Sequence, residues 1–423
     1  MNTSSATRLD LAERDGVSDE PLAVPPFAVV SHYVPPSRFG QPRVLYRLLR
    51  QIPSDQYGLL STTRYNREAP RPDQDGPWLD ACYIHIDLGF PARSVSYRPG
   101  ITGFPRRIYT LANLTVALHR RARQIETVVR ARDYRAIVAC SGDPIDLPAS
   151  AIAARRLGIP LIAYMFDDYG TQYKILPPYQ QFAARYDRFV ARRAERIIVP
   201  NEMLAAEYAA RHRVEPAIIR NPHAGIYGDG NDRPLGTDEV RIVYTGSVYH
   251  VHDDAFARLL EVIEDSEQSL VLDLYSSVDT TRYAVFQRSG RVRHHGHLAD
   301  AEALRVQAEA EILFLPLAFD CPAPDVVRSA LPGKFPEYLA SGRPILVHAP
   351  ADSFVAWYCR RHHCAAVVDE PDTRALADTL GRLLSDGKFR RAIVRAALCR
   401  ARKDFDPAVS GQNLLTVLRS LGG

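Results

Sequence analysis

A lysine and a glutamate three residues apart, Lys334 and Glu337, open a predicted helix that follows a Pro-Gly turn. Residues at this spacing lie on the same side of a helical turn, so both side chains can face one ligand. The N-terminal end of a helix also offers unpaired N–H groups and partial positive charge, which suit a phosphate. Lys334 can therefore face a diphosphate while Glu337 accepts hydrogen bonds from sugar hydroxyls. The alternative is a solvated Lys–Glu pair on an ordinary helix.

Three further loops with small or polar residues follow predicted strands in the same half of the chain. They are Thr245-Gly246-Ser247, Tyr275-Ser276-Ser277 and Gly296-His297-Leu298. Ligands of open parallel sheets bind beyond the carboxyl ends of the strands, and a glycine lets the backbone approach a phosphate. Together with the Lys334 loop, these loops predict a nucleotide site at one edge of a sheet.

Polar residues also follow predicted strands in the first half of the chain. Asp167 and Asp168 come after the buried run 161–166, and His32 comes after the first strand. A carboxylate or imidazole at such a place can act as a general base or orient a bound group. The alternative is a helix cap or loop hydrogen bond for the aspartates, and an ordinary loop histidine for His32.

The elements that must position these residues alternate between apolar strands and amphipathic helices with short links. This alternation is typical of parallel sheets with helices on both faces. We predict an α/β protein in which two Rossmann-like, doubly wound parallel-sheet domains face a cleft. The predicted segments are a disordered leader at 1–26, a first domain at 27–220, a linker at 221–238, a second domain at 239–405 and a C-terminal helix at 406–423 that packs back on the first domain.

The composition of the 423 residues, 46% hydrophobic and 24% charged, is that of a globular protein with two domains. A net charge of +4 is too small for a nucleic-acid binder. The sequence contains no run of 18 apolar residues, so it predicts no membrane span. The polar N-terminus lacks the apolar segment of a signal peptide, and we therefore predict a cytoplasmic location. The Arg-rich face of a predicted helix at 108–132 leaves open a peripheral association with the inner membrane face.

The sequence lacks the motifs of several enzyme classes. The six cysteines form no CxxC pair, and we find no HExxH motif and no DxD-type loop placed to hold a metal, so we predict no metal and no cofactor. Asp167-Asp168 is the one pair that keeps the metal question open. The absence of GxGxxG at the start of either half, and of GxxxxGK[ST], argues against dinucleotide oxidoreductases and P-loop kinases.

The second half resembles the donor-binding domain of glycosyltransferases with the GT-B fold, particularly the broad family 4 type. The matching pieces lie at 243–247, 292–298, 312–317 and 334–344. The match covers roughly residues 240–369, and the first half is similar only in pattern. The resemblance implies transfer of a sugar from a nucleotide diphosphate sugar to an acceptor hydroxyl, with retention of anomeric configuration and without a metal. It also implies that the domain at 239–405 binds the donor and the domain at 27–220 binds the acceptor, where Asp167, Asp168 or His32 would accept the proton of the acceptor hydroxyl or orient it.

The resemblance also implies roles for individual residues. Glu337 would hold the ribose hydroxyls, the Gly246 turn would approach the diphosphate, Lys334 would lie close to the phosphates, and the turn at His297 and Leu298 would meet the base. The full set of predicted donor-binding residues is Gly246, Ser247, Ser276, His297, Leu298, Arg328, Lys334 and Glu337.

Two positions depart from the family pattern. The family often has two glutamates eight positions apart, but Ser329 stands where the first would be, and Asp320 and Asp325 in the preceding loop are candidate substitutes. The family's Arg and Lys pair after the Gly-rich turn is also missing. Tyr249, His250 and His252 stand after that turn instead. Arg328 is a further candidate to contact the phosphates.

Two other functions remain open. A nucleotide-sugar epimerase or hydrolase on the same fold would turn over the donor without an acceptor. A degenerate, non-catalytic binding module is suggested by the missing first glutamate. For the transferase, the acceptor can be a glycan, a lipid-linked molecule or a small molecule, in the biosynthesis of a glycan, a cell-surface polysaccharide or a glycosylated metabolite.

Overall fold

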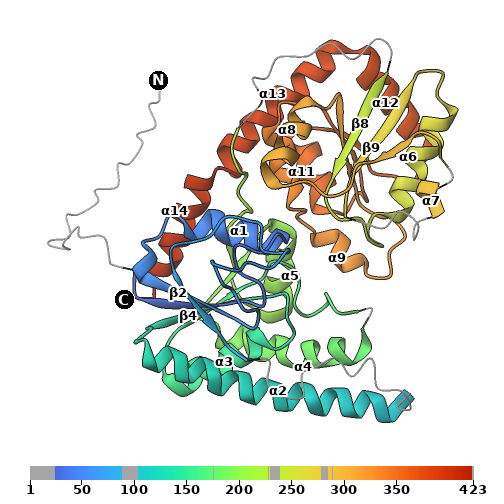
Figure 1. The fold of residues 1–423 in the computed structure, drawn as a ribbon. Helices are drawn as coiled ribbons and strands as arrows, with labels where there is room; N and C mark the ends of the chain where they lie inside the picture. Colours follow the sequence, from blue (N-terminus) through green and yellow to red (C-terminus); the bar gives the residue numbers. More distant parts are fainter. Residues whose placement is uncertain are drawn as a thin grey trace, which may run out of the picture.

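The structure, a computed structural model, describes residues 24–87, 103–174, 176–226, 228, 239–277, 284–287 and 289–421. It contains two α/β domains, each built on one parallel sheet (Figure 1). The first sheet has seven strands in the order β3-β2-β1-β4-β5-β6-β7, and the second has six in the order β10-β9-β8-β11-β12-β13. The prediction of two doubly wound parallel-sheet domains is confirmed.

The sheet of the first domain consists of β1 (Phe27–Val30), β2 (Tyr57–Ser61), β3 (Cys82–His85), β4 (Ala136–Cys140), β5 (Leu161–Tyr164), β6 (Arg196–Val199) and β7 (Ala217–Ile218). Its helices are α1 (Gly40–Leu49), the 3₁₀ helix η1 (Ser54–Gln56), α2 (Gly103–Ala131), α3 (Asp146–Leu157), α4 (Pro177–Arg193) and α5 (Glu202–His212). The long helix α2 runs along the outer edge of this domain (Figure 1).

The second domain is built around β8 (Val240–Thr245), β9 (Leu270–Tyr275), β10 (Val292–His294), β11 (Ile312–Pro316), β12 (Ile345–His348) and β13 (Ala366–Val368). Its helices are α6 (Asp253–Asp265), α7 (Ala284–Gln287), α8 (Asp300–Glu309), α9 (Pro324–Ser329), α10 (Lys334–Ala340), α11 (Phe354–His362), α12 (Thr373–Ser385) and α13 (Gly387–Asp404). The chain ends on α14 (Pro407–Arg419).

Both faces of each sheet are buried, which explains the continuous apolar runs in the sequence. In β1, Phe27 and Val29 enter the core beneath α1, whereas Ala28 and Val30 enter the core beneath α2 and α3. Successive side chains of a strand point to opposite faces, so a strand covered on both faces needs apolar residues throughout.

Helix α14 leaves the second domain and returns to the first (Figure 1). Leu414 and Leu418 are buried in the same core as Leu45 and Leu48 of α1. Asp406 caps the helix by accepting a hydrogen bond from the N–H of Ala408, 2.7 Å away. The end of the chain therefore ties the two domains together.

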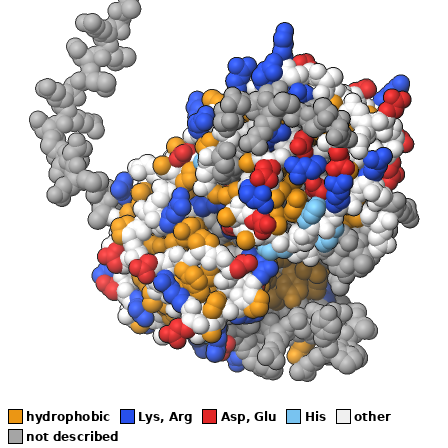
Figure 2. Space-filling model, turned by 45° about the horizontal axis from the view of Figure 1, so that its top comes forward, with side chains coloured by type: hydrophobic (Ala, Val, Ile, Leu, Met, Phe, Trp, Pro, Cys, Tyr) orange, Lys and Arg blue, Asp and Glu red, His pale blue; other side chains and the backbone are white. Residues whose placement is uncertain are grey.

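Parts of the predicted segments lie outside the described residues. These parts are most of the predicted leader, residues 1–23, and residue 227 with residues 229–238 of the predicted linker. Among the described residues, no helix is long and apolar enough to cross a membrane. On the face drawn in Figure 2, basic and acidic side chains are interspersed, as expected for a chain of modest net charge.

Candidate functional site

A cleft of about 470 Å³ lies between the two domains. The loops that follow β8, β9 and β10 and the first turn of α10 form its wall on the second domain. The start of α1 and the loop after β5 form its wall on the first domain. The predicted site residues that line this cleft are Asp167, Gly246, Ser247, His297, Leu298, Lys334 and Glu337.

Lys334 is a half-buried cation beneath the turn that follows β8. Its Nζ donates a hydrogen bond to the hydroxyl of Tyr244, 2.5 Å away, and lies 4.0 Å from the centre of that ring. The Tyr244 hydroxyl donates in turn to the carbonyl oxygen of Ser247, at 2.6 Å. Among the residues that the structure describes, no carboxylate pairs with Lys334, and burial lowers its pKa to about 7. An anion in the cleft would therefore meet a lysine that lacks a counter-ion and favour its charged form.

Gly246 occupies a position that strongly favours glycine. Its φ of +116° lies in a region that residues with a Cβ rarely adopt, and an added Cβ would come within 3.0 Å of Lys334 Cε. The glycine thus allows the turn to pass close over the lysine.

A buried network fixes this turn to α10. The hydroxyl of Tyr338 accepts a hydrogen bond from the N–H of Thr245 at 3.0 Å, and Gln307 donates its side-chain amide to Thr245 Oγ1 at 2.9 Å. Tyr338 belongs to α10 and Gln307 to α8. The β8 turn, α8 and α10 are therefore held as one rigid wall.

Glu337 is held from the first domain. Its Oε1 lies 2.5 Å from a guanidinium nitrogen of Arg47, and its Oε2 accepts a hydrogen bond from the N–H of Ala224 at 3.3 Å. Arg47 also donates to the carbonyl oxygen of Pro222 at 2.7 Å. A second ion pair across the cleft joins Arg43 to Asp300.

The two arginines of α1 were not among the predicted site residues. Arg43 and Arg47 are four residues apart on α1, so they lie on one face of it. That spacing is the only local signal for them, since their partners lie in the other half of the chain.

Asp167 and Asp168, adjacent in sequence, are separated by the fold. Asp167 is exposed and lines the cleft opposite the donor wall. Asp168 is buried, and its carboxylate accepts hydrogen bonds from Arg211 at 2.6 and 2.9 Å, from the N–H of Gly170 and from Thr171 Oγ1. The structure does not bring Asp168 into the cleft, because its carboxylate already binds these four donors.

Three other predicted residues are also outside the cleft lining. His32 Nδ1 lies 2.8 Å from Thr62 Oγ1 and 3.9 Å from Asp143 Oδ2, and burial lowers the pKa of its ring. Ser276 is buried, although Tyr275 and Ser277 on either side of it reach the cleft. Arg328 lies on the far side of α9, where it pairs with Glu207 at 2.6 Å and Asp325 at 3.4 Å.

Metal ligands do not cluster in the part of the chain that the structure describes. No group of three or more His, Cys, Asp or Glu side chains there is arranged to hold a metal ion.

Comparison with known proteins places the site in context. Residues 40–222 match the family model of the glycosyl transferase 4-like domain. The matched segment lies in the first domain, whereas the resemblance in the sequence is carried by motifs of the second. No curated protein matches the chain by sequence.

Solved structures resemble the whole chain. Sucrose-phosphate synthase from Thermosynechococcus elongatus is 15% identical with a TM-score of 0.66, over 94% of this chain and 99% of that one. HepE from Anabaena, in complex with UDP-glucose, is 13% identical with a TM-score of 0.62, over 93% and 99%. α,α-Trehalose 6-phosphate synthase from Burkholderia multivorans is 15% identical with a TM-score of 0.61, over 94% and 97%. At these identities the likeness shows the fold, which is GT-B.

Proposed function

We propose that the chain is a glycosyltransferase whose interdomain cleft binds a nucleotide diphosphate sugar and transfers the sugar to an acceptor hydroxyl, as the GT-B fold and the family 4-like domain at 40–222 support. The observation that carries this proposal is the half-buried Lys334 beneath the Gly246 turn. A desolvated cation that lacks a carboxylate partner among the described residues is costly, and a diphosphate in the cleft would offset that cost.

The same wall accounts for the rest of the donor. Glu337 would accept hydrogen bonds from the ribose hydroxyls, and His297 with Leu298 would meet the base. As the bond between the sugar and the diphosphate breaks, negative charge grows on the leaving phosphate. Lys334 would stabilise this charge in the transition state.

The acceptor would bind against the first domain. Asp167 is the exposed carboxylate of the cleft on that side and would orient the attacking hydroxyl or accept its proton. His32, with Thr62 and Asp143 around its ring, lies at the carboxyl end of β1 and offers a second polar group for the acceptor. Retention of configuration is proposed from the family resemblance.

The structure of HepE with UDP-glucose suggests UDP as the first nucleotide to test. Calorimetric titration of UDP should show one site in the wild-type protein and binding at least about tenfold weaker in Lys334→Met, because a charge-assisted hydrogen bond is lost. Lys403→Met, at an exposed lysine of α13, is the matched control and should bind UDP normally. Unchanged binding of UDP by Lys334→Met would contradict the donor assignment.

A second assay separates transfer from its alternatives. UDP release from UDP-sugars should require an acceptor for a transferase, whereas an epimerase or hydrolase would convert the donor alone. A glycan, lipid-linked or small-molecule acceptor is compatible with the proposal, in any of the biosynthetic roles named above. Peripheral association with a membrane through the arginines of α2 is part of the same proposal, and flotation with vesicles tests it.

A further inference from the structure

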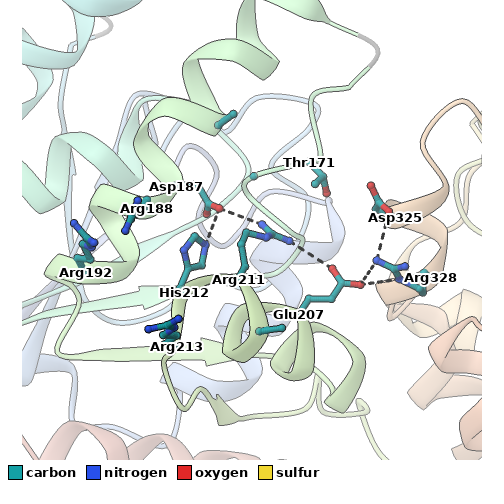
Figure 3. A pocket seen from close by; sticks show the side chains of 13 residues that line it. Thr171, Asp187, Arg188, Arg192, Glu207, Arg211, His212, Arg213, Asp325 and Arg328 are labelled. Atoms are coloured by element: carbon teal, nitrogen blue, oxygen red, sulfur yellow. Dashed lines mark hydrogen bonds and ion pairs between the residues drawn. The ribbon is translucent and has the colours of Figure 1, made fainter.

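A second cavity, of about 840 Å³, lies beside the cleft (Figure 3). Helices α4 and α5 and the loop after β5 form its walls on the first domain, and α9 closes it from the second domain. It shares no lining residue with the cleft. Helix α9 separates the two, because Asp325 and Arg328 face the cavity while Val326 and Val327 face the cleft.

Five arginines line this cavity against three carboxylates. Arg211 pairs with Asp187 at 3.1 Å and with Glu207 at 3.6 Å. Glu207 also reaches Arg328, which in turn pairs with Asp325. The result is a chain of ion pairs across the domain junction in which each carboxylate already has a cation (Figure 3).

The other three arginines of the cavity, Arg188, Arg192 and Arg213, form no ion pair with any residue that the structure describes. Arg188 and Arg192 are one turn apart on α4, so both point from the same face of that helix. Arg213 follows α5 with a left-handed φ of 59°, a conformation that favours glycine. An arginine at this position gains nothing from the backbone geometry.

We propose that this cavity binds a phosphate-bearing ligand through Arg188, Arg192 and Arg213. The planar guanidinium group forms paired hydrogen bonds to phosphate oxygens, and the three arginines present positive charge that the neighbouring carboxylates do not neutralise. The volume is that of a small-molecule site. The site does not depend on the donor cleft, since the two have separate linings.

Inorganic pyrophosphate is the probe, titrated by calorimetry into a Lys334→Met background so that the cleft does not compete for it. One pyrophosphate per chain should bind to this variant. Adding Arg188→Gln and Arg192→Gln should weaken that binding at least about tenfold, because each substitution removes charge-assisted hydrogen bonds. The control is Arg185→Gln on the same helix but outside the cavity, which should leave the affinity unchanged.

Arg213→Gly tests the site without endangering the fold, since glycine suits the left-handed backbone at this position. It should lose affinity for pyrophosphate while its melting temperature stays equal or rises. The proposal is overturned if Lys334→Met binds no pyrophosphate, or if the arginine variants bind it as tightly as Arg185→Gln. UDP titration of Arg188→Gln/Arg192→Gln should be normal, so failure here is distinct from failure of the donor assignment.

Phosphatidylcholine vesicles with and without phosphatidic acid identify the source of the phosphate. If wild-type protein sediments with the acidic vesicles and Arg188→Gln/Arg192→Gln does not, the phosphate belongs to a lipid headgroup. If neither sediments while pyrophosphate still binds the wild type, the ligand is a soluble phosphorylated molecule.

Discussion

The two walls of the cleft use their polar side chains in different ways. On the second domain, hydrogen bonds link Lys334, Tyr244 and Ser247 within one wall. Among the described residues, no carboxylate forms an ion pair with Lys334. On the first domain, Arg43 and Arg47 are both committed to carboxylates of the opposite wall. The wall on the second domain can therefore bind an anion through Lys334. The wall on the first domain uses its arginines to position the carboxylates of the second.

This difference assigns a positioning role to α1. The Glu337 carboxylate is almost fully buried, and a buried carboxylate is stable only when cations and N–H groups surround it. Arg47 supplies that cation from the first domain, so the orientation of the proposed ribose ligand depends on how the domains meet. The predictions below test this division of roles.

The largest effect is expected for Arg47→Met, because it leaves Glu337 buried without its cation. Breaking a buried ion pair from one side should lower the free energy of unfolding by about 3 kcal/mol. Arg50→Met, at an exposed position on the end of α1, is the control and should change it little. The measurement is urea denaturation, and the double variant Arg47→Met/Glu337→Met should recover much of the loss, since no buried charge remains. No recovery in the double variant would show that Arg47 acts through packing alone.

The donor wall is the part of the site that local sequence could predict. Lys334, Glu337 and Gly246 stand in short segments whose turn residues and spacing fix their place at the carboxyl ends of strands. The two-sheet architecture was equally predictable, because strands buried on both faces leave continuous apolar runs.

The partners of these residues could not be predicted, because ion pairs across domains depend on tertiary contacts that leave no local pattern. Asp168 followed a strand as a cleft residue should, yet Arg211 holds it away from the cleft. Arg328 was expected at the donor phosphates, but it lies on the side of α9 that faces away from the cleft. Arg121 belongs to the predicted Arg-rich helix at 108–132, yet it is buried against Asp146.

The next effect concerns Gly246 in the donor wall. Gly246→Val should weaken UDP binding about 100-fold, because the substitution strains a backbone with φ of +116° and brings a Cβ against Lys334. Gly290→Val is the control, since a Cβ there meets nothing within 4 Å. Calorimetry measures both affinities. Normal binding by Gly246→Val would mean that the β8 turn does not approach the nucleotide.

The pH dependence of Lys334 gives a smaller effect. Its pKa is about 7 in the free protein and would rise when a diphosphate binds, so binding above pH 7 should take up a proton. Affinity for UDP should then fall by up to about tenfold per pH unit above 7. Between pH 7 and about 10.4 the unfolded chain binds more protons at this lysine than the folded protein does. The free energy of unfolding of the free protein should therefore rise as the pH rises through that range.

Calorimetry in buffers of different ionisation enthalpy measures the proton uptake directly. Lys334→Met should show none, and Lys403→Met should behave as the wild type. Equal proton uptake by Lys334→Met and the wild type would show that another group titrates. Lys334 would then not be the anion-binding cation that distinguishes the second wall from the first.

The smallest effect is expected for the outer ion pair of the first wall. Arg43 and Asp300 are both about one-third exposed, at 32% and 37%, so solvent screens their attraction. Arg43→Gln should lower the free energy of unfolding by less than about 1 kcal/mol and weaken UDP binding by no more than about threefold. Urea denaturation and calorimetry measure the two quantities. If Arg43→Gln costs as much as Arg47→Met, the first wall acts as one electrostatic unit. If it costs little, the positioning of the donor wall rests on the single buried contact between Arg47 and Glu337.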